Sequence, residues 1–148
     1  MNIIIINGPN INLTGKREPH IYGDHTFEAF LETLRQSEKG MRIDYFQSNI
    51  EGELIDCIQQ SDGKYNGIIL NAGGYTHTSV AIGDAVAAIA TDVVEVHMSN
   101  VFAREPFRHV SLIAGNCIGS ISGFGFGSYL LAVEALKRRS EKYFLPRK

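Results

Sequence analysis

Short apolar segments alternate along this chain with longer segments of helical period, and this alternation constrains the fold more than any other feature. Residues 3–6 are an unbroken run of isoleucine, and residues 68–70 and 93–96 have a similar character apart from Glu95. Apolar runs of this length are typical of strands that are buried on both faces of a parallel sheet. The intervening segments place apolar residues at the spacing of amphipathic helices.

We expect strands at residues 3–6, 41–47, 68–70, 93–96 and 118–121, with helices over 26–40, 51–61, 80–90 and 128–139. Regular alternation of strand and helix predicts an α/β fold in which helices cover both faces of a parallel sheet. With five strands, the pattern favours a flavodoxin-like three-layer sandwich with the sheet order 2-1-3-4-5. No repeat, linker or shift in composition divides the chain, which indicates a single domain over residues 1–148.

Composition and charge exclude several classes of protein. The chain of 148 residues carries a formal net charge of -2, which argues against a nucleic-acid-binding surface. Its apolar runs are too short to cross a membrane, and its first residues lack the pattern of a signal peptide. Its two cysteines, Cys57 and Cys117, are too few for a disulfide framework. We therefore expect a cytoplasmic protein with reduced thiols that binds neither nucleic acid nor membrane.

Polar residues gather where three of the predicted strands end. In an open parallel sheet, ligands bind beyond the carboxyl ends of the strands, so residues that follow different strands converge there. Histidines, arginines, amides and a tyrosine in such numbers exceed what turns and helix caps require. The candidate residues that share this position are Asn7, Asn10, Arg17, His20, Tyr22, Asn71, His77, Glu95, His97, Ser99, Asn100, Arg104 and Arg108.

Several of these residues also have a purely structural interpretation. His77 alone is more often a hydrogen-bonded structural histidine than a catalyst, and Asn10 and Asn71 suit turns because asparagine tolerates left-handed backbone. Arg104 and Arg108 fit a solvated charged surface. The convergence of all of them on one edge of the sheet favours a functional site.

Other kinds of site are disfavoured by the residues present. A phosphate loop after the first strand would need other glycine spacing, and Pro9 removes an amide donor there. The histidines lack metal-ligand spacing, no lysine falls on a predicted inner strand, and no Ser or Cys sits in a strand-to-helix elbow. A receiver module would need acidic residues where Asn7 and Asn71 stand. A flavin-binding module remains open, and an absorbance spectrum would decide it.

Three long motifs resemble those of the type II dehydroquinase family, the trans-dehydratases of the shikimate pathway. They cover residues 7–12 with 15–23, residues 71–79, and residues 95–100 with 104–109. The resemblance extends along nearly the whole chain. It implies a hydro-lyase that converts 3-dehydroquinate to 3-dehydroshikimate through an enolate, in aromatic amino acid and chorismate biosynthesis. It also implies that the reaction uses neither a metal nor another cofactor.

The resemblance further implies a role for each residue that matches a motif. Tyr22 is the expected base that removes a proton beside the ketone, and Arg17 supports its ionised form. His97 is the expected acid that protonates the departing hydroxyl, and Glu95 orients it. Asn10 is expected to hold the water or hydroxyl array around the enolate. The residues expected to bind substrate are Asn71, His77, Asp84, Met98, Ser99 and Arg108.

The residues are chemically suited to these roles. A free tyrosine has a pKa of about 10, so a tyrosine base needs nearby cations, which Arg17 and Arg108 could supply. Residues 8–24 carry the base and are expected to form a lid that excludes water.

The family assembles as trimers that build dodecamers, which implies the same here, with Asp84 reaching a neighbouring active site. Phe102, Pro106 and Gly83 depart from the usual family residues without removing a catalytic group.

Overall fold

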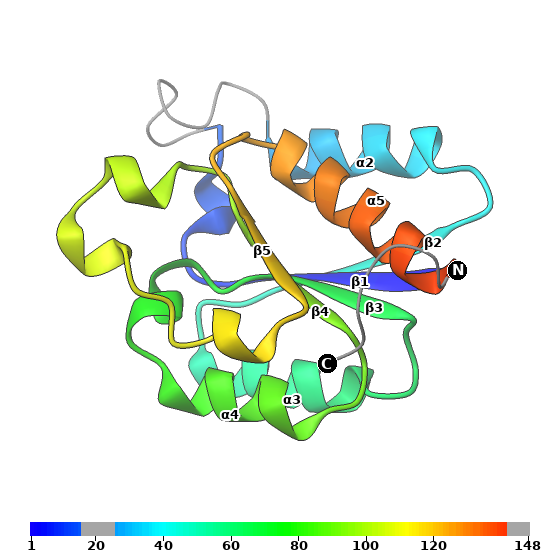
Figure 1. Cartoon of the computed structure of the whole chain (residues 1–148). Coiled ribbons are helices and arrows are strands. Elements are labelled where there is room, and N and C mark those ends of the chain that lie inside the picture. The colour runs from blue at the N-terminus through cyan, green and yellow to red at the C-terminus, as the bar shows by residue number, and fades with distance from the viewer. Residues whose placement is uncertain (16–25, 142–148) are drawn as a thin grey trace.

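A computed structural model describes residues 1–15 and 26–141 of the chain and confirms the predicted sheet. The strands are β1 (Asn2–Asn7), β2 (Arg42–Gln47), β3 (Gly67–Asn71), β4 (Val93–His97) and β5 (Gly119–Ser122). All neighbouring pairs are parallel, and the order is β2-β1-β3-β4-β5, as predicted (Figure 1). Part of the predicted lid, residues 16–24, lies outside the described residues.

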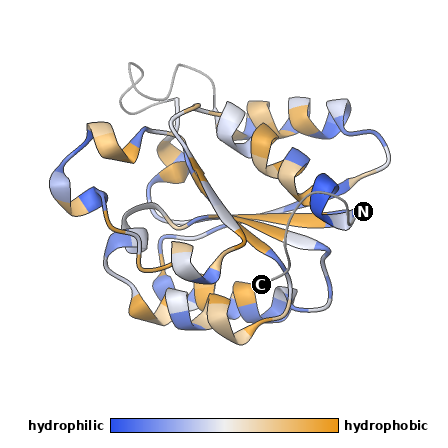
Figure 2. Ribbon diagram, viewed as in Figure 1, coloured by the Kyte–Doolittle hydropathy of each residue, from blue (hydrophilic) through white to orange (hydrophobic). Residues whose placement is uncertain are grey.

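Helices cover both faces of the sheet and make a three-layer sandwich. Helices α2 (Phe27–Ser37) and α5 (Gly127–Ser140) lie on one face, and α3 (Glu51–Ser61) and α4 (Val80–Ala88) lie on the other (Figure 1). Side chains alternate across a strand, so Ile3 and Ile5 pack with the first pair of helices, whereas Ile4 and Ile6 pack with the second. Both faces of the central strands are accordingly apolar (Figure 2), which explains why β1 contains an unbroken isoleucine run.

Local hydrogen bonds set the ends of the helices. The hydroxyl of Thr26 accepts a hydrogen bond from the Ala29 amide at 3.2 Å and caps α2 where the sequence predicts its start. Helix α4 ends at Ala88, two residues earlier than predicted. The amides of Ala90 and Thr91 instead donate to Oδ1 of Asp62, each at 3.0 Å, which holds that segment out of the helix.

The carboxyl ends of β1 and β3 lie side by side, and the backbone segments that follow them approach each other closely. Asn7 is in register with Asn71, and the amide of Gly8 donates to the Asn71 carbonyl at 2.7 Å. A Cβ atom at position 8 would lie 2.5 Å from the carbonyl oxygen of Ala72, so this close approach of the two backbones requires glycine. Short 3-10 helices then leave this edge: Ile11–Leu13, Gly73–His77, Val101–Ala103 and Pro106–Arg108.

Cys57 and Cys117 both stand as thiols and not as a disulfide; Cys117 is buried, whereas Cys57 is partly exposed. Within residues 1–15 and 26–141, no helix is both long enough and apolar enough to cross a membrane.

Candidate active site

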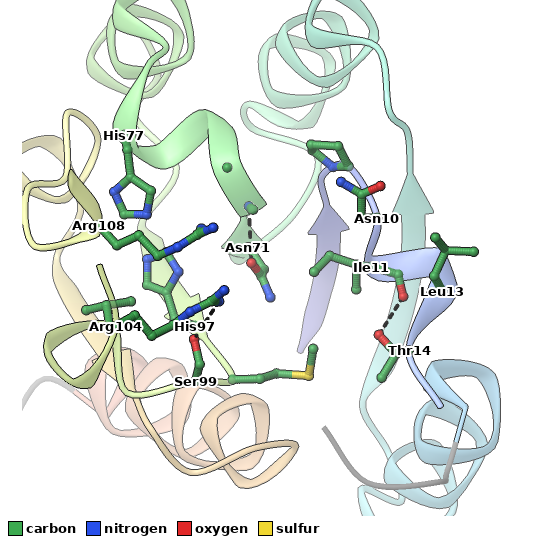
Figure 3. Close-up of a pocket in the computed structure, with 15 residues that line it drawn as sticks. Asn10, Ile11, Leu13, Thr14, Asn71, His77, His97, Ser99, Arg104 and Arg108 are labelled. Atoms are coloured by element: carbon green, nitrogen blue, oxygen red, sulfur yellow. Dashed lines mark hydrogen bonds between the residues drawn. The ribbon is translucent and has the colours of Figure 1, made fainter. Parts of the chain in front are cut away.

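A cavity of about 180 Å³ lies at the carboxyl edge of the sheet, where the sequence predicts a site. Its walls come from the segments that follow β1, β3 and β4 (Figure 3). Asn10, Ile11 and Thr14 lie on one side of it, and the histidines and arginines lie across from them (Figure 3). The lining residues are Pro9, Asn10, Ile11, Leu13, Thr14, Asn71, Gly73, Gly74, His77, His97, Met98, Ser99, Val101, Arg104 and Arg108.

Two histidines with parallel rings form part of the cavity wall. His97 is the last residue of β4, and His77 ends the 3-10 helix after β3. Their ring centroids are 6.1 Å apart, with an angle of 19° between the planes. Nδ1 of His77 lies 2.7 Å from the carbonyl oxygen of Val110. Because a carbonyl only accepts, Nδ1 carries the proton, and Nε2 of a neutral His77 is left as an acceptor.

A buried carboxylate stands behind His97. Glu95 is only 1% exposed, and its Oε1 lies 3.3 Å from Nε2 of His97. The hydroxyl of Ser111 donates to the same oxygen at 2.7 Å. Burial by itself raises the pKa of the Glu95 carboxyl, but the hydrogen bonds from His97, Ser111 and Ser120, together with the charge of His97, lower the pKa below its usual value. Glu95 therefore remains an acceptor that orients the imidazole ring.

The Asn71 amide is held in one orientation by buried partners. Its Nδ2 donates to the Tyr129 hydroxyl at 2.8 Å, and its Oδ1 accepts from the Gly73 amide at 3.2 Å. The Tyr129 hydroxyl donates in turn to Oδ1 of Asn7 at 2.9 Å. Asn71, Tyr129 and Asn7 are at most 3% exposed. This chain of hydrogen bonds ties α5 to β1 and β3 directly below the cavity.

Two guanidinium groups make the β4 side of the cavity positive. The side chains of Arg104 and Arg108 are 22% and 24% exposed and line the cavity, so they do not form a solvated surface patch. Nη1 of Arg104 donates to the Ser99 hydroxyl at 3.4 Å. Nε of Arg108 lies 2.8 Å from the carboxylate of Glu105, which is itself 52% exposed. This wall is suited to an anionic ligand with hydroxyl groups.

Asn10 is both a turn residue and a lining residue of the cavity. Its φ angle of 69° is left-handed, which asparagine tolerates better than most residues, and its amide donates to Oδ1 of Asn49 at 3.1 Å. The same residue lines the cavity opposite the histidines (Figure 3). The turn conformation is thus what brings Asn10 to the site.

The structure brings most of the predicted site residues together. Glu95 contacts His97 from behind instead of lining the cavity, and Asp84 is exposed on α4, away from the lining residues. The predicted base Tyr22 and its partner Arg17 lie outside the described residues. The predicted residues that line the cavity are Asn10, Asn71, His77, His97, Met98, Ser99 and Arg108.

Sequence reasoning assigned no role to three residues that the structure connects with the site. Arg104 lies in the polar segment after β4 that indicated the site, and it lines the cavity. The sequence motifs gave it no individual role. Ser111 and Tyr129 gave no such signal, because they lie far along the chain from their partners. In the described part of the chain, no group of three or more His, Cys, Asp or Glu residues could hold a metal ion.

Comparison with known proteins identifies the family. Residues 1–137 match the family model described as Dehydroquinase class II. A curated 3-dehydroquinate dehydratase of Prochlorococcus marinus (strain NATL1A) is 51% identical over 138 residues, covering 92% of this chain and 95% of that protein. Another from Exiguobacterium sp. (strain ATCC BAA-1283 / AT1b) is 53% identical over 137 residues, covering 92% and 94%.

A solved structure shows the same likeness in three dimensions. The crystal structure of the type II dehydroquinase from Butyrivibrio crossotus DSM 2876 superposes with a TM-score of 0.89 at 41% identity, covering 93% of this chain and 97% of that one. The match favours a dehydratase over the receiver, flavin and hydrolase alternatives. Sequence, fold and cavity agree, and the chain belongs to the dehydroquinase class II family of hydro-lyases.

Proposed function

We propose that this chain catalyses the trans elimination of water from 3-dehydroquinate to 3-dehydroshikimate through an enolate, as a step of the shikimate pathway. The observation that carries the proposal is the buried Glu95–His97 pair, which faces a cavity lined by Arg104 and Arg108. An acid held by a carboxylate beside two fixed cations suits the loss of hydroxide from an anionic substrate. The 3-dehydroquinate dehydratase names of the relatives support the same substrate.

The walls of the cavity offer complementary partners for the substrate. The guanidinium groups of Arg104 and Arg108 supply charge and paired donors for its carboxylate or hydroxyl groups. Asn71 has an amide proton beyond the one given to Tyr129, and Nε2 of neutral His77 can accept from a hydroxyl. Recognition would therefore require both the acid group and the hydroxyl groups of the substrate.

His97 would act as the acid through a defined nitrogen. Its Nε2 faces Oε1 of Glu95 at 3.3 Å, so Nδ1 is the ring nitrogen left for the substrate. In the proposed reaction, a base removes the proton beside the ketone and the electron pair moves onto the ketone oxygen as an enolate. The enolate then expels the hydroxyl group, which leaves as water with a proton from Nδ1. Glu95 stabilises the protonated ring before the transfer.

The base and the enolate require further residues. We assign the base to Tyr22, assisted by Arg17, and the stabilisation of the enolate to donors around Asn10. Asn10 lies across the cavity from the histidines, which supports this division of labour (Figure 3). We assign no metal or other cofactor to the reaction.

Assembly and location also belong to the proposal. We propose a cytoplasmic dodecamer built from trimers, in which Asp84 reaches a neighbouring active site. The exposed place of Asp84 on α4 supports such a contact. Light scattering coupled to gel filtration measures the assembly, and a monomer with full activity would contradict it.

The reaction is tested by mixing purified, chelator-treated protein with 3-dehydroquinate and following the absorbance of the conjugated product. Prompt product formation, unchanged by borohydride, supports a dehydratase that forms no imine with a lysine. No product at any protein concentration would refute the proposal.

The base is tested by Tyr22→Phe, which we expect to abolish turnover while the substrate affinity changes by no more than a few fold, because only the reacting hydroxyl is removed. Tyr65→Phe removes a hydroxyl that donates to the partly buried Asp44, away from the residues that line the cavity, and serves as the matched control with normal turnover. Turnover by Tyr22→Phe at the normal rate would remove Tyr22 from the role of base.

A further inference from the structure

We propose that Ser111 is a positioning residue for the acid His97 and acts on it through Glu95. The inference rests on the proposed dehydration reaction and deepens its description of the acid. Ser111 lies outside the three motifs that identify the family in the sequence, and it does not line the cavity. Its effect must therefore pass through the carboxylate that it contacts.

The hydrogen bonds of Ser111 leave its proton a single direction. Its hydroxyl oxygen accepts from the amide of Ile113 at 3.1 Å and from the amide of Ala114 at 2.9 Å. A hydroxyl group has two lone pairs and one proton, so both lone pairs are taken by the backbone. The remaining proton points to Oε1 of Glu95, at 2.7 Å. The backbone thus fixes a hydroxyl that would otherwise be free to rotate.

The same carboxylate oxygen faces the imidazole ring. Oε1 of Glu95 lies 2.7 Å from the Ser111 hydroxyl and 3.3 Å from Nε2 of His97. Because the Ser111 proton already points at this oxygen, Oε1 serves as an acceptor, and Nε2 of His97 must supply the proton between them. Ser111 thereby holds Glu95 in place and selects the His97 tautomer whose Nδ1 is left for the substrate.

The loop that carries Ser111 is anchored beside the other histidine. The Val110 carbonyl accepts from Nδ1 of His77 at 2.7 Å, and the Leu112 amide donates to the Thr76 carbonyl at 2.9 Å. Residues 110–112 are therefore attached to the 3-10 helix after β3 on both sides of Ser111. Since the rings of His77 and His97 stack, one short loop positions both of them.

The experiment compares Ser111→Ala, Glu95→Gln and the double variant in the 3-dehydroquinate assay. We expect Ser111→Ala to lower kcat by about 10- to 100-fold, the equivalent of one hydrogen bond to a charged group, with KM within about twofold. Adding Ser111→Ala to Glu95→Gln should change kcat by less than about twofold, because the path through Glu95 is already broken. Ser111→Thr keeps the hydroxyl and should recover most of the activity.

A matched serine separates positioning from stability. Ser61 is buried in α3 and donates to the Cys57 carbonyl at 2.7 Å, so Ser61→Ala should lower the melting temperature without lowering kcat. Losses that simply multiply in the double variant, or a normal kcat in Ser111→Ala, would overturn the proposal. Should Ser111→Ala fail to fold, Ser111→Cys retains the volume with a weaker donor and carries the same expectation.

The tautomer of His97 provides a readout that does not depend on the substrate. The ¹⁵N shifts of the neutral ring should report a proton on Nε2 in the natural protein and a mixture of tautomers in Ser111→Ala. A proton on Nδ1 in the natural protein would overturn the positioning role. A chain that fails to turn over 3-dehydroquinate but has the expected tautomer would refute the proposed function and leave the positioning role standing.

Discussion

Replacing Tyr129 with phenylalanine tests whether the buried hydrogen bonds beneath the cavity hold the site together. The hydroxyl accepts from Nδ2 of Asn71 at 2.8 Å and donates to Oδ1 of Asn7 at 2.9 Å, and Tyr129 is 0% exposed. Phenylalanine keeps the ring and its packing, whereas the two hydrogen bonds of the hydroxyl are lost in Tyr129→Phe. Both polar partners then stay buried without the hydroxyl.

The expected loss of stability follows from the burial of the two partners. Oδ1 of Asn7 belongs to a side chain that is 0% exposed, so its desolvation is not compensated, at a cost of about 1–3 kcal/mol. Asn71 borders the cavity, where water can replace the hydroxyl, and we assign this bond about 1 kcal/mol. We therefore expect Tyr129→Phe to lower the free energy of unfolding by about 2–4 kcal/mol.

Urea unfolding followed by circular dichroism, at one fixed protein concentration, measures this loss. Tyr65→Phe is the matched control, because its hydroxyl contacts Asp44, whose side chain is 27% exposed, so water can take its place. We expect the control to lose less than about 1 kcal/mol. The freed Asn71 amide should also raise KM for 3-dehydroquinate. Equal losses in the two variants, with an unchanged KM, would refute the reasoning.

Two further predictions concern glycine packing and the partly buried Tyr65. Gly83→Ala would place a Cβ atom 2.7 Å from the carbonyl oxygen of Leu112, so we expect lower stability and lower activity, measured by thermal unfolding and the enone assay. Gly52→Ala in α3 meets nothing within 4 Å and should stabilise by about 0.5–1 kcal/mol; a stabilised Gly83→Ala would contradict the packing argument. The hydrogen bond to Asp44, together with burial and the charge of Asp44, raises the pKa of Tyr65 to about 12. In Asp44→Asn the Tyr65 phenol should ionise at lower pH. The ionisation is followed by the ultraviolet absorbance of phenolate, and the titration of the same protein with Tyr65→Phe is subtracted to isolate Tyr65. An unchanged midpoint of the Tyr65 titration would contradict the assigned cause.

Much of the fold could be predicted because the local pattern of apolar, polar and capping residues reflects which faces of each element are buried and where a helix begins. Only a strand covered on both faces favours an unbroken isoleucine run such as residues 3–6, and β1 packs Ile3 and Ile4 into opposite layers. Thr26 marks the start of α2 because its hydroxyl caps the helix locally. Once the strands were placed, the topology of parallel sheets predicted the order and the edge at which the site lies.

The site was predictable where its residues follow directly from strand ends. His97 is the last residue of β4 and Asn71 is the last of β3, so the position of each strand also positions its functional side chain. Arg104 was visible as a charged residue in the same segment, but only the folded loop decides that it faces the cavity and not the solvent.

The sequence by itself determined the elements, their order and the edge of the sheet that carries the polar residues, because these depend on local periodicity and on the general rules of parallel sheets. Only the tertiary structure decided which partners hold those residues: Ser111 meets Glu95 from 16 positions away, and Tyr129 meets Asn71 from 58. Asp62 likewise ends α4 from 28 positions away. Such contacts depend on the packing and register of distant segments, and no local pattern records them.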